Sequence, residues 1–344
     1  MFDRLTGNQR AKQLLRRMLA ERRVPNGMIF AGEEGVGKKL FAIELAKALN
    51  CRAPRGIEAC DHCAACLRAR FDLPPADDAE ANKGLIWSEH ADLALVRAPG
   101  RAILVQQIRE LERETNFRPY EGKARVFLVE DADKLNEASS NAFLKTLEEA
   151  ASTSYLILLT SRPAALLPTI RSRCQMVRFA PLEAGEIEEH LARQRKASAD
   201  EARLRARLAR GSLGRALSLN IDDYRQQRET MLGVLEALTL KPNRTHLLRV
   251  AEDLSDARRK DEYEPGLETL ETLVHDLWLI SSGAPDEQVV NDDLRARLAG
   301  ISARTPARRA ARWLSQIEEL RRQLTVNINR KIATDALFLA MAES

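Results

Sequence analysis

The feature that most constrains this chain is a glycine-rich loop between an apolar run and an amphipathic segment. It reads Gly32-Glu-Glu-Gly35-Val-Gly37-Lys38-Lys39. In the pattern G-x-x-x-x-G-K-[ST], backbone N–H groups and the lysine hold phosphates, and the final hydroxyl binds the metal of a nucleotide. Gly32, Gly37 and Lys38 satisfy this pattern, and Lys39 breaks it. The loop therefore predicts a nucleotide-binding type of fold, while Lys39 argues against hydrolysis.

A second apolar run ends in acidic residues further along the chain. Val126–Val129 is followed directly by Glu130 and Asp131. In P-loop hydrolases a strand of this kind ends in acids that hold Mg²⁺ and polarise water, usually in the order Asp-Glu. Acids after a strand are by themselves more often a solvated turn, but the phosphate loop upstream favours the metal-binding interpretation. We interpret Glu130 and Asp131 as a degenerate form of that pair, because the inverted order changes the reach of each carboxylate by one methylene.

Short apolar runs alternate with helical patterns over roughly the first 165 residues, which predicts a parallel sheet with helices on both faces. The expected strands are Gly27–Ala31, Leu93–Val96, Arg125–Val129 and Tyr155–Thr160. The expected helices are Lys38–Leu49, Val105–Asn116 and Glu137–Glu149. Asn136 is the expected N-cap of the third helix.

The remainder of the chain has helical periodicity only. Apolar residues recur at helical spacing, as at Trp313, Ile317 and Leu320. We therefore predict an α/β domain over residues 1–180, a small helical domain over 181–222 and a larger all-α domain over 223–344.

Composition excludes some classes of protein. The 344 residues are 44% hydrophobic, enough for a core, yet no apolar run reaches the roughly 18–20 residues that span a bilayer. The N-terminus has no apolar signal region, so we expect a cytoplasmic protein. The formal charge of +4 permits contact with nucleic acid without arguing for it.

Four cysteines lie close together after the glycine-rich loop, at Cys51, Cys60, Cys63 and Cys66. Two overlapping C-x-x-C steps with a fourth cysteine suit a closed tetrahedral zinc site, which would be structural because no position is left for water. Four free buried thiols are the alternative. His62 is expected to be a bystander, since four thiolates are available. A finger that reads nucleic acid is disfavoured, because few basic or aromatic residues follow the cluster.

Two arginines follow the last predicted strand of the α/β domain. They are Arg171 and Arg173, in the sequence Pro168-Thr-Ile-Arg171-Ser172-Arg173-Cys174. They could be ordinary surface charges. They could also include an arginine finger, a guanidinium that neutralises charge at the phosphate of a neighbouring subunit. Composition does not decide between the two.

Taken together, these motifs resemble the AAA+ clamp-loader subunits of bacterial DNA polymerase III, and the resemblance runs nearly end to end. Further stretches that carry it are Asn8-Gln9, Val24-Pro-Asn-Gly27, Asn141–Glu149, Ser172-Arg173-Cys174, Asn327-Ile-Asn329-Arg330 and Thr334-Asp335. Ala150 departs from the family pattern, which has proline there. The cysteines and the Ser-Arg-Cys stretch are common to the motor and the stationary branches of this family.

The losses at the nucleotide site set this chain apart from the motor branch. That branch has threonine where Lys39 stands and an Asp-Glu pair where Glu130-Asp131 stands. The motor branch also has an arginine in a G-S-L-R-D stretch of its second domain. In this chain the stretch reads Gly211-Ser-Leu-Gly-Arg215, so the arginine is displaced by one position, which puts a nucleotide-sensing role for Arg215 in doubt. The resemblance is therefore to the stationary, non-hydrolysing branch.

The resemblance implies a RecA-like AAA+ domain with an inserted four-cysteine zinc module at 51–66, a helical lid domain and an all-α collar domain. It implies a hetero-pentamer with the motor (gamma/tau) and delta subunits, which loads the sliding clamp on primed DNA. It implies that Arg173 acts in trans, with Zn²⁺ as a structural ion, and it puts ATP binding at Gly32–Lys39 in doubt. The alternative is an ATP-hydrolysing motor subunit or another AAA+ ATPase, which Lys38 and the loop glycines keep open.

Overall fold

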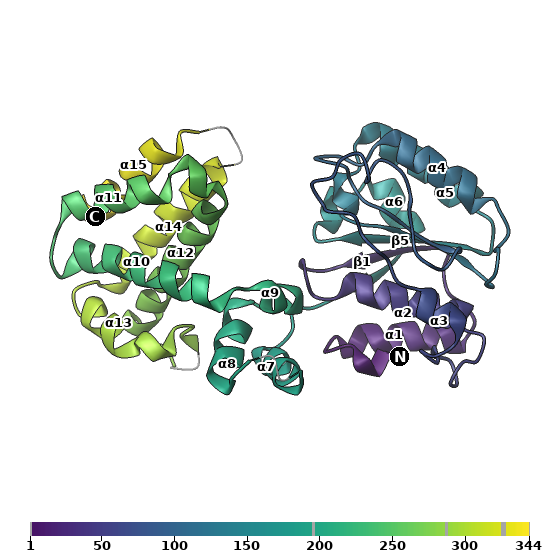
Figure 1. Ribbon diagram of the computed structural model, residues 1–344, viewed down its shortest axis with the longest axis horizontal. Coiled ribbons are helices and arrows are strands. Elements are labelled where there is room, and N and C mark those ends of the chain that lie inside the picture. The colour runs from purple at the N-terminus through teal and green to yellow at the C-terminus, as the bar shows by residue number, and fades with distance from the viewer. Residues whose placement is uncertain (1, 195–196, 286–287, 325–327, 344) are drawn as a thin grey trace. The chain divides into compact units, whose positions relative to one another are not determined.

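The chain divides into two compact units, residues 1–217 and 218–344, and each is described by itself. The computed structural model describes all residues except 1, 195–196, 286–287, 325–327 and 344. Asn327 of the C-terminal motif therefore lies outside the described residues. Figure 1 labels the helices and strands along the chain. Within the described ranges, no helix has the length and apolar character needed to cross a bilayer.

The first unit is built on one six-stranded sheet. Its strands are β1 (Gly27–Ala31), β2 (Ile86–Trp87), β3 (Leu93–Val96), β4 (Arg125–Val129), β5 (Ser154–Thr160) and β6 (Gln175–Arg178). They lie in the order β2-β3-β4-β5-β1-β6, and all neighbours are parallel except β2 and β3. The predicted parallel α/β sheet is confirmed, with three strands at their expected bounds and β5 beginning one residue early.

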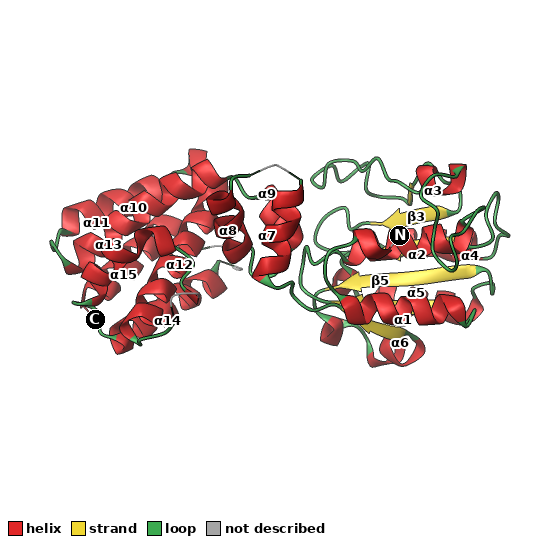
Figure 2. Ribbon diagram, turned by 90° about the horizontal axis from the view of Figure 1, so that it is seen from below, coloured by secondary structure: helices red, strands yellow, loops and turns green. Residues whose placement is uncertain are grey.

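Helices cover both faces of this sheet, as the near-continuous apolar strands predict. The helices of this part are α1 (Gln9–Ala20), α2 (Lys38–Asn50), α3 (Ala64–Arg68), α4 (Val105–Thr115), α5 (Glu137–Glu149) and α6 (Pro168–Arg173). The short 3₁₀ helices are η1 (Phe2–Arg4), η2 (Ala132–Lys134) and η3 (Pro163–Ala165). Figure 1 shows α1 and α2 on one side of the sheet and α4, α5 and α6 on the other, and Figure 2 shows the same elements from below.

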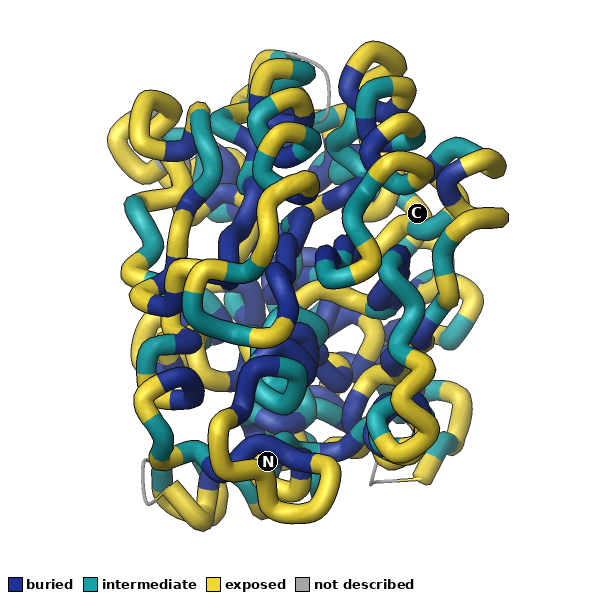
Figure 3. Tube along the Cα trace, turned by 90° about the vertical axis from the view of Figure 1, so that its right-hand side faces the viewer, coloured by how far each residue is buried: buried dark blue, intermediate teal, exposed yellow. Residues whose placement is uncertain are grey.

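Alternate strand residues feed two separate cores. Met28 and Phe30 of β1 pack with α1 and α2, whereas Ile29 packs with α4 and α5. Because successive side chains of a strand point to opposite faces, a strand buried on both sides has to be apolar throughout. Figure 3 shows the buried stretches inside the fold and the exposed ones on loops and outer helix turns.

Two asparagines of the sequence motifs hold loops in place. Asn136 caps α5 as predicted, because its side chain accepts a hydrogen bond from the N–H of Ser139 at 3.0 Å. The side-chain amide of Asn26 donates to the carbonyl oxygens of Ser152 and Ser154, at 3.2 and 2.6 Å. Asn26 thereby joins the entry of β1 to the turn before β5.

Three short helices complete the first unit and continue to its boundary: α7 (Ala184–Arg193), α8 (Ala199–Leu208) and α9 (Leu213–Ser218). They enclose a small core of their own that includes Ile187, Leu191 and Ala206. The side chain of Asn8 exchanges two hydrogen bonds with the backbone of Ala180, which ties the start of the chain to the entry of these helices.

The second unit is all helical in its described residues. Its helices are α10 (Ile221–Thr239), α11 (Arg244–Leu254), α12 (Tyr263–Ser281), α13 (Arg295–Ser302), α14 (Ala307–Gln323) and α15 (Arg330–Glu343), with 3₁₀ helices η4 (Ala257–Glu262) and η6 (Asp292–Leu294). The apolar face of α12 lies at the centre, where Leu270 and Leu273 are fully buried.

The predicted fold class, a P-loop α/β domain with a cysteine insertion followed by helices, is confirmed.

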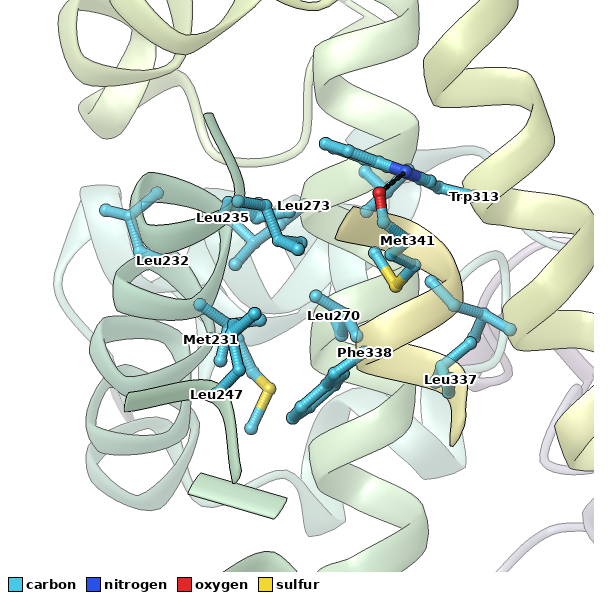
Figure 4. Close-up of a cluster of buried hydrophobic side chains, with 14 of the residues drawn as sticks. Met231, Leu232, Leu235, Leu247, Leu270, Leu273, Trp313, Leu337, Phe338 and Met341 are labelled. Carbon is cyan, nitrogen blue, oxygen red and sulfur yellow. Dashed lines mark hydrogen bonds between the residues drawn. The ribbon is translucent and has the colours of Figure 1, made fainter. Parts of the chain in front are cut away.

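Figure 4 shows the core of the second unit, in which Trp313 of α14 lies beside Met341 of α15. The indole N–H of Trp313 donates to the carbonyl oxygen of Met341 at 2.9 Å, so its polar group is satisfied while the ring is buried. Thr334, from the C-terminal motif, is buried and shares a 2.7 Å hydrogen bond with the hydroxyl of Tyr263. The motif at Thr334 therefore fastens α15 to α12.

Candidate functional site

The phosphate loop forms the turn between β1 and α2. Gly35 and Gly37 have φ of 74° and 100°, in the left-handed region that favours glycine. A Cβ at Gly32 would collide with the carbonyl oxygen of Phe179, and a Cβ at Gly35 would collide with the hydroxyl of Ser212. The backbone of the loop is therefore approached closely from two sides, and glycine is required at these positions.

The lysine of the loop lies against the loop itself. Nζ of Lys38 donates to the carbonyl oxygens of Gly32 and Glu33, both at 2.6 Å. Burial lowers the pKa of Lys38, and nearby acids including Asp131 and Glu34 oppose that shift. In this arrangement the ammonium that would reach the phosphates of a nucleotide is satisfied by the chain's own carbonyl groups.

Lys39 forms an ion pair with the acid at the end of β4. Its Nζ lies 2.7 Å from Oε1 of Glu130, and Nε of Arg97 lies 2.8 Å from Oε2 of the same carboxylate. Burial would raise the pKa of Glu130, but the hydrogen bonds and charges of Lys39 and Arg97 outweigh burial and lower it. Both oxygens of the acid that would hold a metal are therefore occupied by cations of the protein.

Arg97 is a site residue that the sequence analysis missed, although the sequence holds a signal for it. It follows β3 directly, and β3 pairs with β4 in parallel with Val96 opposite Val129. The residues after two neighbouring parallel strands emerge at the same edge of the sheet, so Arg97 and Glu130 are brought together there.

The second acid of the pair lies in a different environment. Asp131 has a left-handed backbone with φ of 48°, and its carboxylate pairs with Lys134 at 2.9 Å. Asp133 instead contacts the next strand, because it accepts a 2.7 Å hydrogen bond from the hydroxyl of Thr160 and pairs with Arg162. The ion-pair partners of Glu130 and Asp131 are thus different cations.

The loop also contacts the start of α9. The backbone N–H of Gly214 donates to the carbonyl oxygen of Gly35 at 2.9 Å. The hydroxyl of Ser212 accepts a hydrogen bond from the N–H of Arg215 at 3.1 Å, which begins α9. The stretch that holds Arg215 is therefore in direct backbone contact with the phosphate loop.

The four cysteines converge after α2. The Sγ atoms of Cys51, Cys60, Cys63 and Cys66 all lie within 4.8 Å of one another, and three of these residues are buried. Backbone N–H groups of Cys60 and Cys63 each donate to a sulfur at 3.3 Å. Four thiolates about 2.3 Å from one ion fit this spacing, so the cluster could hold a tetrahedral metal. The predicted four-cysteine group is confirmed as a possible metal site.

The surroundings of the cysteine cluster attach it to the body of the first unit. Glu121 pairs with Arg68 of α3, and Lys47 of α2 lies 3.4 Å from Asp61. His62 directs Nδ1 to the carbonyl oxygen of Cys60 at 2.8 Å, and it is not a member of the cluster. The cluster is thus an insertion held against α2.

Arg173 lies at the C-terminal end of α6, at the surface. Its side chain is 45% exposed, and the guanidinium pairs with Glu148 of α5 at 2.7 Å and donates to the carbonyl oxygen of Thr169 at 3.3 Å. Cys174, the next residue, is packed against the start of β1, and burial raises the pKa of its thiol to about 12. A half-buried cysteine thus lies next to an exposed arginine.

The sheet order, the phosphate loop after β1, the acids after β4 and the inserted cysteines are those of an α/β protein of the P-loop class. The sequence model of a family described as "DNA polymerase III, delta subunit" matches residues 7–183. A second, described as "DNA polymerase III, delta subunit, C terminal", matches residues 223–342. The chain belongs to the delta-prime family of DNA polymerase III clamp-loader subunits, which confirms the predicted resemblance.

Individual relatives agree with this family. DNA polymerase III subunit delta' of Bacillus subtilis is 26% identical over 97% of this chain and 96% of its own length. Subunit delta' of Escherichia coli is 29% identical over 89% of this chain and 85% of its own length. Subunit tau of Escherichia coli is 32% identical, but the match spans 63% of this chain and 32% of tau. Of these three relatives, the two that match over most of both lengths are delta-prime subunits.

Proposed function

We propose that this chain is the stationary subunit of a clamp-loader ring, which supports loading of the sliding clamp on primed DNA during replication in the cytoplasm. The proposed partners are the motor (gamma/tau) and delta subunits in a hetero-pentamer. The match to delta' proteins over nearly their full length supports this role. We assign an AAA+ domain to residues 1–180, a lid to 181–222 and a collar to 223–344, so that the collar joins the subunits.

The chain's own nucleotide site is proposed to be inactive. Lys39 and Arg97 engage both oxygens of Glu130, and Lys38 is engaged by carbonyl groups of the loop. A divalent metal would have to displace an ammonium from Glu130 and would gain no hydroxyl ligand from position 39. These contacts support a subunit without ATPase activity of its own.

The observation that carries the proposal is the exposure of Arg173. Its guanidinium is held at the surface by the carboxylate of Glu148. A planar guanidinium can exchange a carboxylate for a phosphate of a neighbouring subunit, since both accept two parallel hydrogen bonds. We propose that Arg173 is an arginine finger that acts in trans on the ATP of an adjacent motor subunit.

The proposed ion at the cysteine cluster is structural Zn²⁺. The four sulfurs lie at the mutual spacing of a tetrahedral site, and four thiolates leave no open position for a reacting water. Backbone N–H groups directed at the sulfurs stabilise thiolate charge around such an ion. The role supported by this chemistry is to hold residues 51–66 against α2.

The test is reconstitution of the complete loader with motor and delta subunits. We expect Arg173→Ala to leave this chain folded and to slow ATP hydrolysis at the adjacent site by roughly 10³-fold, as loss of an arginine finger does. Arg171→Ala is the matched control, because Arg171 is an exposed arginine on the same short helix. Unchanged hydrolysis at that interface in the Arg173 variant would remove the claim.

A motor subunit is the second candidate, because Gly32, Gly37 and Lys38 keep the phosphate-binding part of the loop. Binding and turnover of labelled ATP by the isolated chain, with and without Mg²⁺, separates the two functions. Tight Mg²⁺-dependent binding with turnover would overturn the stationary role.

A further inference from the structure

The position after the loop lysine contains an ion pair where other P-loop proteins bind a metal. Lys39 lies in the first turn of α2, and its ammonium is 2.7 Å from Glu130 at the end of β4. In nucleotide-hydrolysing proteins of this fold, a hydroxyl at this position and an acid at the end of that strand share Mg²⁺. The ammonium therefore bridges the same two elements that the metal would bridge.

The negative charge of Glu130 is more than neutralised without a metal. Arg97 contacts the second oxygen of Glu130 at 2.8 Å, and the side chains of Arg97, Glu130 and Lys39 are 16%, 20% and 30% exposed. Two cations around one carboxylate leave the group with a net positive charge in a partly desolvated position. A divalent cation brought to Glu130 would be repelled by both of them, and the ammonium displaced from Glu130 would lose this acidic partner.

The remaining contacts of the loop do not depend on Lys39. Lys38 is held by carbonyl groups of Gly32 and Glu33, which a phosphate can replace as a partner for an ammonium. The N–H of Gly214 bonds to the carbonyl oxygen of Gly35, on the backbone rather than on a side chain. Of Lys38, Lys39 and the backbone of Gly214, only Lys39 contacts Glu130, where the metal would bind.

We infer that Lys39 is a built-in replacement for the metal ion and that this one residue decides whether the loop accepts a Mg²⁺-nucleotide. Replacement of Lys39 by threonine would remove the internal cation, free one oxygen of Glu130 and supply the missing hydroxyl. The loop would then bind nucleotide in a Mg²⁺-dependent manner. This inference rests on the proposed function, in which the unaltered loop does not work as a motor.

The experiment measures binding of a fluorescent ATP analogue to the full-length chain, in Mg²⁺ and in EDTA. We expect Lys39→Thr to bind at least about tenfold more tightly in Mg²⁺ than in EDTA, which is readily resolved in such a titration. The unaltered chain and Lys39→Met should show no Mg²⁺ dependence, because methionine removes the ammonium without adding an oxygen.

The outcomes separate this inference from the proposed function. If folded Lys39→Thr, checked by circular dichroism, shows no Mg²⁺ dependence, Lys39 is not the deciding residue, and the stationary role is untouched. If the unaltered chain binds Mg²⁺-nucleotide tightly, both claims are overturned. If the threonine variant is unstable, Lys39→Ser replaces it, because serine also removes the ammonium and supplies a hydroxyl. The serine variant has to show the same Mg²⁺ dependence.

Discussion

Two ion pairs of equal length lie in very different surroundings in the first unit. Lys39–Glu130 and Arg173–Glu148 both measure 2.7 Å. The first pair is mostly buried, and its carboxylate has a second cation in Arg97, whereas the side chains of the second pair are 45% and 53% exposed. Distance alone would rank the two pairs together. Burial and the number of partners separate a mostly buried pair with a second cation from an exposed pair with a single ion-pair contact.

The contrast fits a division of labour within one domain. The loop at Gly32–Lys39 keeps its shape through glycines and internal hydrogen bonds, and it connects β1, β4 and α9. The helix with Arg173 presents a charged group at the surface next to a half-buried cysteine. A nucleotide-type core with an exposed arginine suits the proposed action on the site of a neighbouring subunit.

The largest effect on stability should come from the cysteine cluster. This cluster lies against α2, the helix that also carries Lys39 of the mostly buried ion pair. Removing the proposed zinc with a chelator, or replacing Cys63 by serine, should lower the free energy of unfolding of the first unit by several kcal/mol, since structural zinc contributes folding energy directly. Metal analysis should find about one zinc per chain. A metal-free preparation with unchanged thermal unfolding would contradict a structural ion.

The next largest effect on stability tests the mostly buried Lys39–Glu130 pair. Glu130→Gln leaves Lys39 and Arg97 without a carboxylate in a partly buried position, and we expect a loss of about 1–3 kcal/mol in the free energy of unfolding. A urea titration that follows unfolding of the first unit measures this loss of stability. Equal stability of the variant and the unaltered chain would show that the Lys39–Glu130 pair does not stabilise the loop. The contrast between a structural pair and an exposed pair would then fail.

The exposed pair should respond far less. Glu148→Gln removes the partner of Arg173 at the surface, where an ion pair contributes about 0–1 kcal/mol. The same urea titration should place this variant close to the unaltered chain. A loss of stability as large as that of Glu130→Gln would mean that the Arg173–Glu148 pair stabilises the fold, which would weaken the assignment of Arg173 as an arginine finger.

The smallest effect is a dependence on pH. The pKa of Glu130 is lowered below its ordinary value of 4.5 by Lys39 and Arg97, against the effect of burial. Stability from these contacts is therefore fully present above about pH 4.5 and is lost as the pH falls through the folded pKa. Glu130→Gln should remove this part of the acid sensitivity. An unchanged pH profile would mean that Glu130 is not the group responsible.

The sheet and the main helices could be predicted because their burial leaves a periodic pattern. Strands β1, β3 and β4 are buried at every position, and α5 has both its N-cap and its apolar face in the sequence. The edge strands β2 and β6 were missed, since β2 has two residues and β6 buries only Val177. A short edge strand exposes too much of its length for its pattern to stand out.

The candidate site could be predicted residue by residue but not as a set of contacts. The change at Lys39 and the order of Glu130 and Asp131 are visible in the sequence, as are the four cysteines. The role of Arg97 depends on which strands are neighbours, and the Glu148–Arg173 pair depends on the packing of α5 against α6. Such contacts follow from the fold, which a single sequence does not specify at side-chain detail.

Single-turnover hydrolysis of ATP in the reconstituted loader, compared between Lys38→Ala and Arg173→Ala, distinguishes a stationary subunit from a motor. Lys38 belongs to the chain's own loop, and Arg173 is proposed to act on a neighbour. We expect Lys38→Ala to leave hydrolysis within about twofold, while Arg173→Ala slows the adjacent site by roughly 10³-fold. A large loss with Lys38→Ala and none with Arg173→Ala would show that this chain is itself a motor.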